Sequence, residues 1–217
     1  MKNIIQNIRR LFFDNSCTCC GEKASDNLIY LCYNCLDKIV RQKSLNKVGD
    51  TYYIWPYKGE FRKLLLEYKN NSRLALGKII SSLIEEEIFK VVYEEDIDYI
   101  VPIPINFRRE QIRGFNQVEE ILKNLNYSFL KTNRVKNTKK MFKILDKEKR
   151  ENNIKNSFKV DKEFKAKNIL IFDDIITTGA TIEEFKRELI KNGEVNKIVV
   201  FSLSASKTYM NSNKRMC

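Results

Sequence analysis

Two carboxylates and a threonine-rich turn are the residues of this chain whose types and spacing most clearly indicate chemistry. Asp173 and Asp174 directly follow the apolar run 169–172, which is typical of a short strand buried in a parallel sheet. The turn 177–181 (Thr-Thr-Gly-Ala-Thr) comes next, ahead of a helix that we expect over residues 182–191. Backbone N–H groups and hydroxyls before a helix N-terminus form a phosphate site. A phosphate and a polyol or metal ion could therefore bind here side by side.

Two other interpretations of this stretch are less favoured. The first is a buried strand that ends in a charged turn and binds nothing. The second is another nucleotide fold, of which the P-loop has a defined pattern, Gly-x-x-x-x-Gly-Lys-Ser/Thr. Around Gly77 the chain has Ser72 at the first position of that pattern and Ile79 at the last. The phosphate-and-polyol site is therefore the prediction that we carry forward.

Cysteine spacing near the N-terminus predicts a metal site. Cys17 and Cys20 form one C-x-x-C pair, and Cys32 and Cys35 form another after eleven intervening residues. This is the spacing of a small zinc site, and in a cytosolic protein it favours metal over disulfides. The chain contains no histidine, so all four ligands would be cysteines. A tight turn after Cys20 favours Cys17 over Cys19 as the first ligand, although Cys19 could replace it.

Composition excludes several classes of function. The absence of histidine removes Ser-His-Asp, Cys-His and His-Glu-x-x-His chemistry. The net charge is +12, and residues 131–167 hold 14 Lys and Arg against 5 Asp and Glu, which indicates a polyanionic partner or else a solvated charged loop. No apolar run approaches the ~20 residues that span a bilayer, and residues 1–13 lack a signal-peptide core. We therefore expect a cytoplasmic protein without a membrane span.

The remaining segments predict the elements that position these residues. We expect strands over 51–57, 98–104 and 197–206, and a helical region from 61 to 84 that is interrupted at 70–72. Residues 2–13 predict a short amphipathic helix, and residues 207–217 predict a loose polar tail. Together these patterns indicate a doubly wound α/β fold, in which ligands bind beyond the carboxyl ends of the strands. We place a domain boundary near residue 46, which separates residues 1–46 from residues 47–217.

A second anion-binding corner follows the strand expected over residues 98–104. Pro102 and Pro104 limit that strand, because proline cannot continue a hydrogen-bonded ladder. Basic and amide-bearing residues fill 105–117 and lead into a helix that ends near Leu125. Two such corners on one sheet suit a ligand with a phosphate at each end. Lys69, at the interruption of the helical region, could also contact phosphate or could simply be a solvated helix end.

Several of these segments together resemble known families. The run 169–181 resembles the phosphoribosyl pyrophosphate (PRPP) signature of type I phosphoribosyltransferases. The four cysteines, Tyr57-x-Gly59 with Lys69, the run Val101-Pro-Ile-Pro104 and the segment 113–117 (Arg-Gly-Phe-Asn-Gln) extend this resemblance to the ComF competence family over nearly the whole chain. The segment 113–117 is its most specific element.

The resemblance implies a fold and a set of site residues. The fold would be the doubly wound, mostly parallel sheet of the type I phosphoribosyltransferases, with a small N-terminal zinc-binding module. Asp173 and Asp174 would be the catalytic pair that faces the ribose hydroxyls, and Mg²⁺ would accompany PRPP. The residues implied around the 5′-phosphate are Thr177, Thr178, Gly179, Ala180 and Thr181. The residues implied around the pyrophosphate and in a hood over the site are Arg113, Arg134 and Arg150.

The resemblance leaves two main functional hypotheses and a weaker third. The first is an enzyme that transfers phosphoribosyl to an acceptor, which no residue identifies. The second is a non-catalytic protein that handles incoming single-stranded DNA and uses the PRPP pocket for sensing. Family members often have other residues at the positions of Gln111 and Met141, a departure that favours PRPP binding over turnover. In the third, the cysteine module and residues 2–13 dock onto a partner such as a helicase or another competence protein.

Overall fold

The computed structural model describes residues 16–70, 73–135, 155–160 and 164–213. Within these residues the first half of the chain forms α2 (Tyr33–Arg41), β1 (Asn46–Val48), β2 (Thr51–Pro56), α3 (Gly59–Asn70), α4 (Leu74–Glu94) and β3 (Tyr99–Pro102). The second half forms α5 (Phe107–Arg113), α6 (Gln117–Asn124), β4 (Asn133–Arg134), β5 (Phe158–Lys159), β6 (Phe164–Ile176), α8 (Ala180–Lys191), β7 (Gly193–Ala205) and α9 (Lys207–Asn213). The helix expected over residues 2–13 lies outside the described residues.

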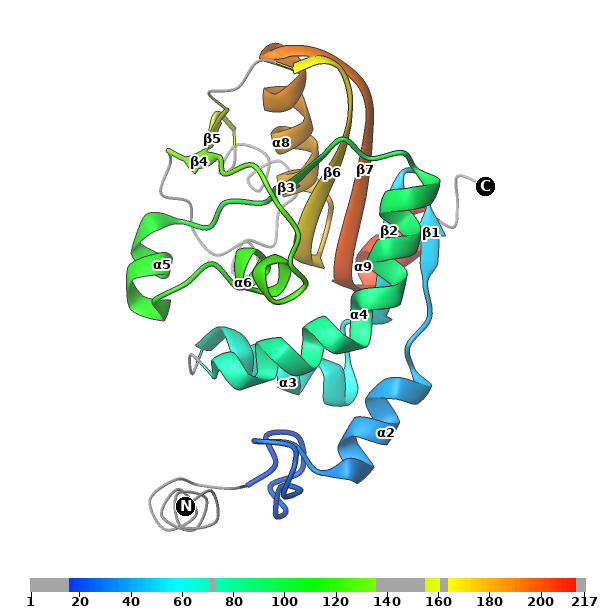
Figure 1. Ribbon diagram of the computed structural model, residues 1–217, viewed down its shortest axis with the longest axis vertical. Helices are drawn as coiled ribbons and strands as arrows, with labels where there is room; N and C mark the ends of the chain where they lie inside the picture. The colour runs from blue at the N-terminus through cyan, green and yellow to red at the C-terminus, as the bar shows by residue number, and fades with distance from the viewer. Residues whose placement is uncertain (1–15, 71–72, 136–154, 161–163, 214–217) are drawn as a thin grey trace.

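A mostly parallel sheet organises the molecule. Its strand order is β1-β2-β7-β6-β3, in which only β1 runs antiparallel to its neighbour. Strands β6 and β7 are the longest and lie side by side at its centre, as Figure 1 shows. The expectation of a mixed α/β fold with a mostly parallel sheet is confirmed.

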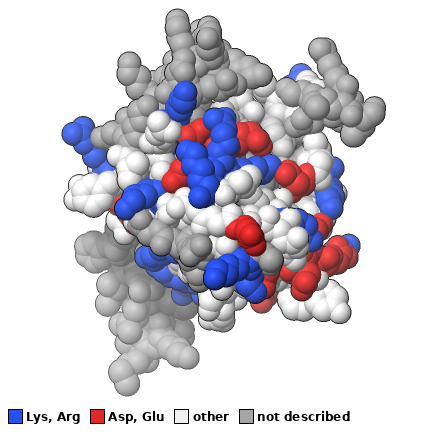
Figure 2. Space-filling view, turned by 90° about the horizontal axis from the view of Figure 1, so that it is seen from above, with Lys and Arg blue, Asp and Glu red and all other residues white. Residues whose placement is uncertain are grey.

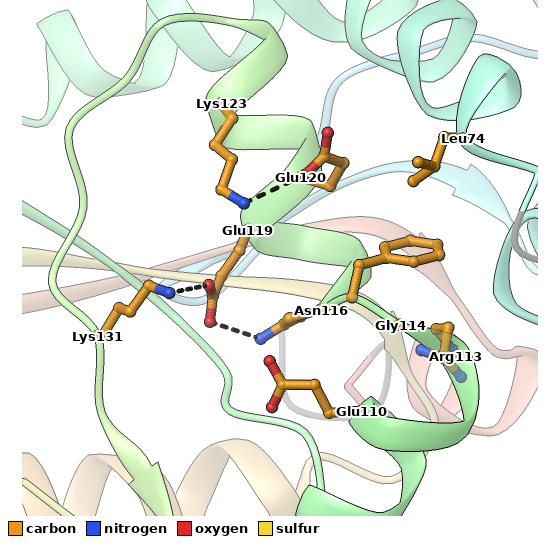
Figure 3. A pocket seen from close by; sticks show the side chains of 10 residues that line it. Leu74, Glu110, Arg113, Gly114, Asn116, Glu119, Glu120, Lys123 and Lys131 are labelled. Carbon is orange, nitrogen blue, oxygen red and sulfur yellow. Dashed lines mark hydrogen bonds and ion pairs between the residues drawn. The ribbon is translucent and has the colours of Figure 1, made fainter.

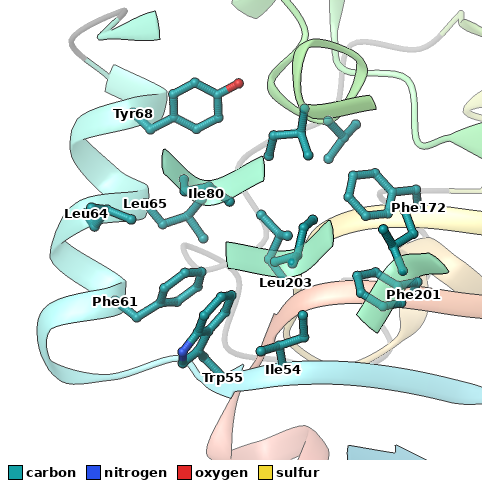
Figure 4. Packing of buried hydrophobic residues seen from close by; sticks show 14 of the residues in the cluster. Ile54, Trp55, Phe61, Leu64, Leu65, Tyr68, Ile80, Phe172, Phe201 and Leu203 are labelled. Carbon is teal, nitrogen blue, oxygen red and sulfur yellow. The ribbon is translucent and has the colours of Figure 1, made fainter. Parts of the chain in front are cut away.

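Helices cover both faces of the sheet. Alternate residues of each central strand point to opposite sides, so each strand contributes side chains to the packing on both faces. Leu170 and Phe172 pack with α3, α4 and α6 on one face. Ile169 and Ile171 pack with α8 on the other. On the first face the rings of Trp55 and Phe61 stack with centroids 4.0 Å apart, and Figure 4 shows this packing continuing along α3. An all-apolar run such as 169–172 is what a strand covered on both faces requires.

Two details of the sequence prediction are wrong. Residues 207–213 form the helix α9 and not a loose tail, because the Ser206 hydroxyl accepts a hydrogen bond from the Tyr209 backbone N–H and caps the helix. Strand β6 also does not end before the two aspartates. It continues to Ile176, and Asp173 pairs in register with Ser202 of β7. The carboxylates therefore belong to the last part of the strand and share its rigidity.

Candidate ligand-binding cavity and cysteine cluster

A cavity of about 480 Å³ opens at the carboxyl ends of β3 and β6. Six residues predicted as site residues line it, namely Arg113, Arg134, Asp173, Asp174, Thr177 and Thr181. Thr178, Gly179 and Ala180 continue the loop from β6 into α8 without lining the wall, and Arg150 lies outside the described residues. The two anion-binding segments predicted from the sequence, residues 105–117 and 177–181, thus contribute to one cavity.

Asp174 is held on several sides. Its side chain is buried, and its Oδ2 atom lies 2.7 Å from Nζ of Lys69 on α3. The same oxygen accepts a hydrogen bond from Nε2 of Gln117, whose Oε1 accepts one from Arg113. Sequence reasoning weighed Lys69 as a phosphate contact or a solvated helix end and did not pair it with Asp174. A lysine at the end of one helix carries no local signal that its partner lies a hundred residues away.

Asp173 has a different environment from its neighbour. Its Oδ1 atom accepts a hydrogen bond of 2.8 Å from the backbone N–H of Asp174. Burial and then the charge of Asp174 raise the pKa of the Asp173 carboxyl to about 7, against the opposing effects of Lys69, that N–H group and Arg134. The Asp173 carboxyl therefore gains or loses a proton near neutral pH.

Among the described residues, five cationic side chains line the same cavity as these two carboxylates: Arg62, Lys69, Arg109, Arg113 and Arg134. Burial lowers the pKa of Arg109 and of Arg113. Burial and then the charge of Arg109 lower the pKa of Arg134 to about 10, which leaves Arg134 charged at neutral pH. Sequence reasoning missed Arg62 and Arg109. Arg109 had a detectable signal, because it precedes Arg113 by four residues and so shares its helix face. These five cations outnumber the two aspartates, so the cavity suits a negatively charged ligand.

The loop after β6 presents the N-terminus of α8 near this cavity. Gly179 occupies the N-cap position with φ 82°, a left-handed conformation that favours glycine. No side chain caps α8, although a serine, threonine or aspartate would usually do so at this position. The first N–H groups of the helix and the hydroxyls of Thr177 and Thr181 are therefore placed to meet an anion.

The second group of predicted residues is a cluster of four cysteines. The Sγ atoms of Cys17, Cys20, Cys32 and Cys35 all lie within 4.8 Å of one another, and those of Cys20 and Cys32 are 3.7 Å apart. Four ligands about 2.3 Å from a tetrahedral Zn²⁺ would be about 3.8 Å apart, so these cysteines fit a structural zinc. Burial, and then the neighbouring sulfurs of Cys20, Cys32 and Cys17, raise the pKa of Cys35.

Cys19 stands apart from this cluster. Its Sγ donates a hydrogen bond of 3.4 Å to the carbonyl oxygen of Glu60, and its own carbonyl accepts one of 2.6 Å from Lys63. Burial raises the pKa of Cys19 to about 11, which keeps it a neutral thiol. The sequence leaves open whether Cys17 or Cys19 is the first zinc ligand, and this geometry favours Cys17.

Comparisons with known proteins identify the family of this chain. Competence protein ComFC of Streptococcus pneumoniae is 30% identical over 161 residues, which cover 69% of this chain and 66% of that protein. The chain belongs to the ComF family. Competence protein F of Haemophilus influenzae is 27% identical over 202 residues (85% and 83% covered), and DNA utilization protein YhgH of Escherichia coli is 26% identical over 186 residues (82% and 78% covered). No family model matches the chain.

The segment on which the resemblance to the ComF family most depends forms the turn between α5 and α6. Gly114 ends α5 with φ 83°, and Oδ1 of Asn116 accepts a hydrogen bond from the Val118 N–H to cap α6. Arg113 and Gln117, on either side of the turn, face the cavity. Gly114 and Asn116 therefore build the turn. Arg113 and Gln117 form the hydrogen-bonded chain that ends at Asp174.

A smaller cavity of about 330 Å³ lies on the other side of this turn in the ComF chain. Figure 3 shows its charged side chains largely satisfied by one another, since Lys131 pairs with Glu119 and Lys123 with Glu120. Among the residues that the structure describes, Arg113 alone lines both cavities. The larger cavity, with its excess of cations, is therefore the candidate ligand site.

The basic segment that the sequence indicates for a polyanion lies largely outside the described residues, which omit 136–154. On the face of the molecule in Figure 2, Lys and Arg side chains lie among Asp and Glu side chains over the described surface. None of the described helices is long and apolar enough to cross a membrane.

Proposed function

We propose that this ComF-family chain binds PRPP in the 480 Å³ cavity and has the fold of the type I phosphoribosyltransferases. One observation carries the proposal. A single cavity joins a threonine loop at a helix N-terminus, an aspartate pair and a wall of five cationic side chains. PRPP has a phosphate at one end, a diphosphate at the other and a diol between them, which is the same order of chemical groups.

Each part of the cavity would take one part of PRPP. Residues 177–181 would bind the 5′-phosphate through N–H groups and hydroxyls. Asp173 and Asp174 would accept hydrogen bonds from the ribose hydroxyls, while Arg113, Arg134 and the undescribed Arg150 would neutralise the diphosphate. Mg²⁺ bound with PRPP would supply further positive charge between the diphosphate and the ribose. The oxygen-rich pair Asp173 and Asp174 fits the vicinity of such a hard cation.

The proposed reaction is transfer of the phosphoribosyl group to an acceptor with release of pyrophosphate. Positive charge develops on the ribose as the C1–O bond to pyrophosphate breaks, and the departing oxygens gain negative charge. Preorganised cations at the leaving group and carboxylates beside the ring stabilise both charges in place. The cations of the cavity wall would therefore bind the diphosphate of PRPP and also stabilise it as the leaving group.

The N-terminal cysteines would bind a structural zinc ion through Cys17, Cys20, Cys32 and Cys35. Zinc in a closed four-sulfur site supplies folding energy and not chemistry. We propose residues 1–46 as the module that this ion stabilises and residues 47–217 as the phosphoribosyltransferase-like domain.

The second candidate function is a non-catalytic one in DNA handling. The similar proteins are named for DNA utilization and competence, and those names mention no transferase. In this alternative the chain takes part in handling single-stranded DNA during transformation, together with a helicase or another competence protein. PRPP in the cavity would then act only as a sensed ligand.

Calorimetric titration of PRPP with Mg²⁺ tests the proposed site. We expect binding by the wild-type chain, and at least tenfold weaker binding when Asp173→Asn and Asp174→Asn are combined. Thr181→Val keeps the side-chain volume but removes a hydroxyl, so it should weaken PRPP and ribose 5-phosphate alike. Lys131→Met, outside this cavity, is the matched control. Unchanged PRPP affinity in both site variants would contradict the assignment.

Two further measurements separate the candidate functions. Pyrophosphate release from bound PRPP with a panel of bases would support transfer, and its absence with every base would favour ligand sensing. Binding of single-stranded DNA at two salt concentrations would test the DNA role, because phosphate contacts weaken as salt rises. DNA binding that ignores both salt and PRPP would count against a shared site.

A further inference from the structure

The start of α9 lies directly behind the loop proposed for the 5′-phosphate. Ser206, between β7 and α9, donates its backbone N–H to the Ile176 carbonyl at 2.8 Å. Its Oγ–H donates to the carbonyl oxygen of Thr177 at 2.6 Å, and the same Oγ accepts a hydrogen bond of 3.2 Å from the Tyr209 N–H. One side chain therefore ties the end of β6, the first loop residue and the N-terminus of α9 together.

A second contact supports the same loop. A Cβ atom at Gly179 would lie 3.4 Å from the Tyr209 ring, so the ring is in close contact with the position where the loop turns left-handed. Tyr209 also packs against the buried cluster that includes Ile182 and Phe185 of α8. Figure 1 shows α9 at the carboxyl ends of β6 and β7, where this loop begins. The cap residue Ser206 thus contacts the first residue of the loop, and Tyr209 of α9 contacts the third.

We propose that α9 is a brace for the phosphate loop, with Ser206 and Tyr209 as positioning residues for the 5′-phosphate. This inference rests on the proposed function of the cavity. A loop that binds an anion through N–H groups loses affinity if binding must first order its backbone. The brace removes that cost, because the Thr177 carbonyl and the Gly179 turn are held before any ligand arrives.

The brace acts at one end of the ligand. Neither Ser206 nor Tyr209 lines the cavity, and the cationic wall for the diphosphate stands on α3, α5 and β4. Loss of the brace should therefore weaken the 5′-phosphate end and leave the diphosphate end unchanged. A merely structural role would weaken both ends together, so this asymmetry is the diagnostic property.

Calorimetry with two half-ligands on the full chain tests the inference. For Ser206→Ala we expect ribose 5-phosphate to bind about threefold to tenfold more weakly, the loss typical of one hydrogen bond, and pyrophosphate with Mg²⁺ to bind as in wild type. Ser206→Thr keeps the hydroxyl and should restore ribose 5-phosphate affinity to within twofold. Tyr209→Leu, which removes the ring at Gly179, should reproduce the Ser206→Ala pattern. Asn211→Ala, exposed on the same helix, is the control.

Three outcomes would overturn the brace. They are unchanged ribose 5-phosphate affinity in Ser206→Ala, equal losses for both half-ligands in a variant whose circular dichroism is native, and no rescue by Ser206→Thr. A wild-type chain that binds neither half-ligand would instead overturn the proposed function, and the brace with it. Wild-type binding with unaffected variants would overturn the brace alone.

Discussion

Adjacent carboxylates in this chain differ in what surrounds them, although the sequence presents them as a pair. Asp174 shares one oxygen between Lys69 and Gln117, so its negative charge is compensated. Asp173 accepts a backbone N–H and is otherwise buried beside that charge, so its proton is held up to a pH of about 7. The two carboxyls line the same cavity, so their difference comes from the groups that each one contacts.

The raised pKa of Asp173 predicts how stability depends on pH. The folded value of about 7 exceeds the ordinary 3.8, so the protonated carboxyl favours the folded state. That contribution is complete below about pH 3.8 and is lost as pH rises through 7. Asp173→Asn, which stays neutral, should therefore raise the free energy of unfolding at pH 8 more than at pH 5, by on the order of 1–3 kcal/mol. Urea unfolding at the two pH values measures the difference.

Asp174→Asn is the matched comparison for this pH dependence. It breaks the ion pair between the buried Asp174 carboxylate and the partly buried Lys69, so it should destabilise the chain at both pH values. An equal gain for Asp173→Asn at pH 5 and pH 8 would show that its carboxyl titrates normally.

At the scale of elements, the contact between α3 and α4 decides how firmly Gln117 is held. Tyr68 of α3 is fully buried, and its hydroxyl donates a hydrogen bond of 2.9 Å to the Gln117 carbonyl. Gly77 of α4 lies against this ring, where a Cβ atom would approach to 2.9 Å. Gly77 inside α4 therefore leaves room for the Tyr68 ring, whose hydroxyl holds Gln117 at the start of α6.

Gly77→Ala sets two effects against each other. Alanine stabilises a helix interior by about 1 kcal/mol relative to glycine, but overpacking a buried ring costs about 1–3 kcal/mol. Because Tyr68 cannot move into solvent, we expect a net loss of about 1 kcal/mol in urea unfolding. In a Tyr68→Leu background the clash is relieved, and the same change should become stabilising. Stabilisation in the wild-type background would show that the ring can shift.

The sequence predicted those parts of the fold and site that depend on local patterns. The run before Asp173, the turn that follows it and the two C-x-x-C pairs each contain their own signal of periodicity or spacing. The pairing of Lys69 with Asp174 and the choice of Cys17 over Cys19 depend on contacts between distant segments. The helix α9 was missed for the same reason, since a short polar segment becomes helical only when Ser206 caps it and Tyr209 finds a surface.

At the scale of the whole molecule, the cysteine cluster and the sheet share one hydrophobic core. Cys17 and Cys35 belong to the same buried cluster as Trp55, Phe61 and Phe172. Helix α3 extends from one region to the other, because Glu60 accepts the Cys19 thiol hydrogen near its start and Lys69 reaches Asp174 near its end. We therefore expect the proposed 1–46 module and the rest of the chain to unfold together.

Metal removal tests this expectation. Metal analysis should find about one zinc ion per chain, and strong chelation should lower the melting temperature of the whole chain in a single calorimetric transition. The double variant Cys32→Ser with Cys35→Ser should lose zinc binding, whereas Cys19→Ser should keep the zinc content of the wild-type chain. Two separate transitions, of which only the smaller responds to chelator, would show that the module folds independently.

Strand order has a consequence for how the protein is made. Strand β2 is buried from Thr51 to Trp55, but its parallel neighbour β7 pairs it from Val200 onward, about 150 residues later. On the ribosome, β2 can form only its hairpin with β1 until β7 has been synthesised. The hydrogen bonding of the central sheet can therefore be completed only after β7 has been synthesised, and until then the apolar residues of β2 can be covered only by helices such as α3. The two cysteine pairs, by contrast, lie between residues 17 and 35 and precede every strand of this sheet, so the proposed zinc ion could bind while synthesis of the sheet continues.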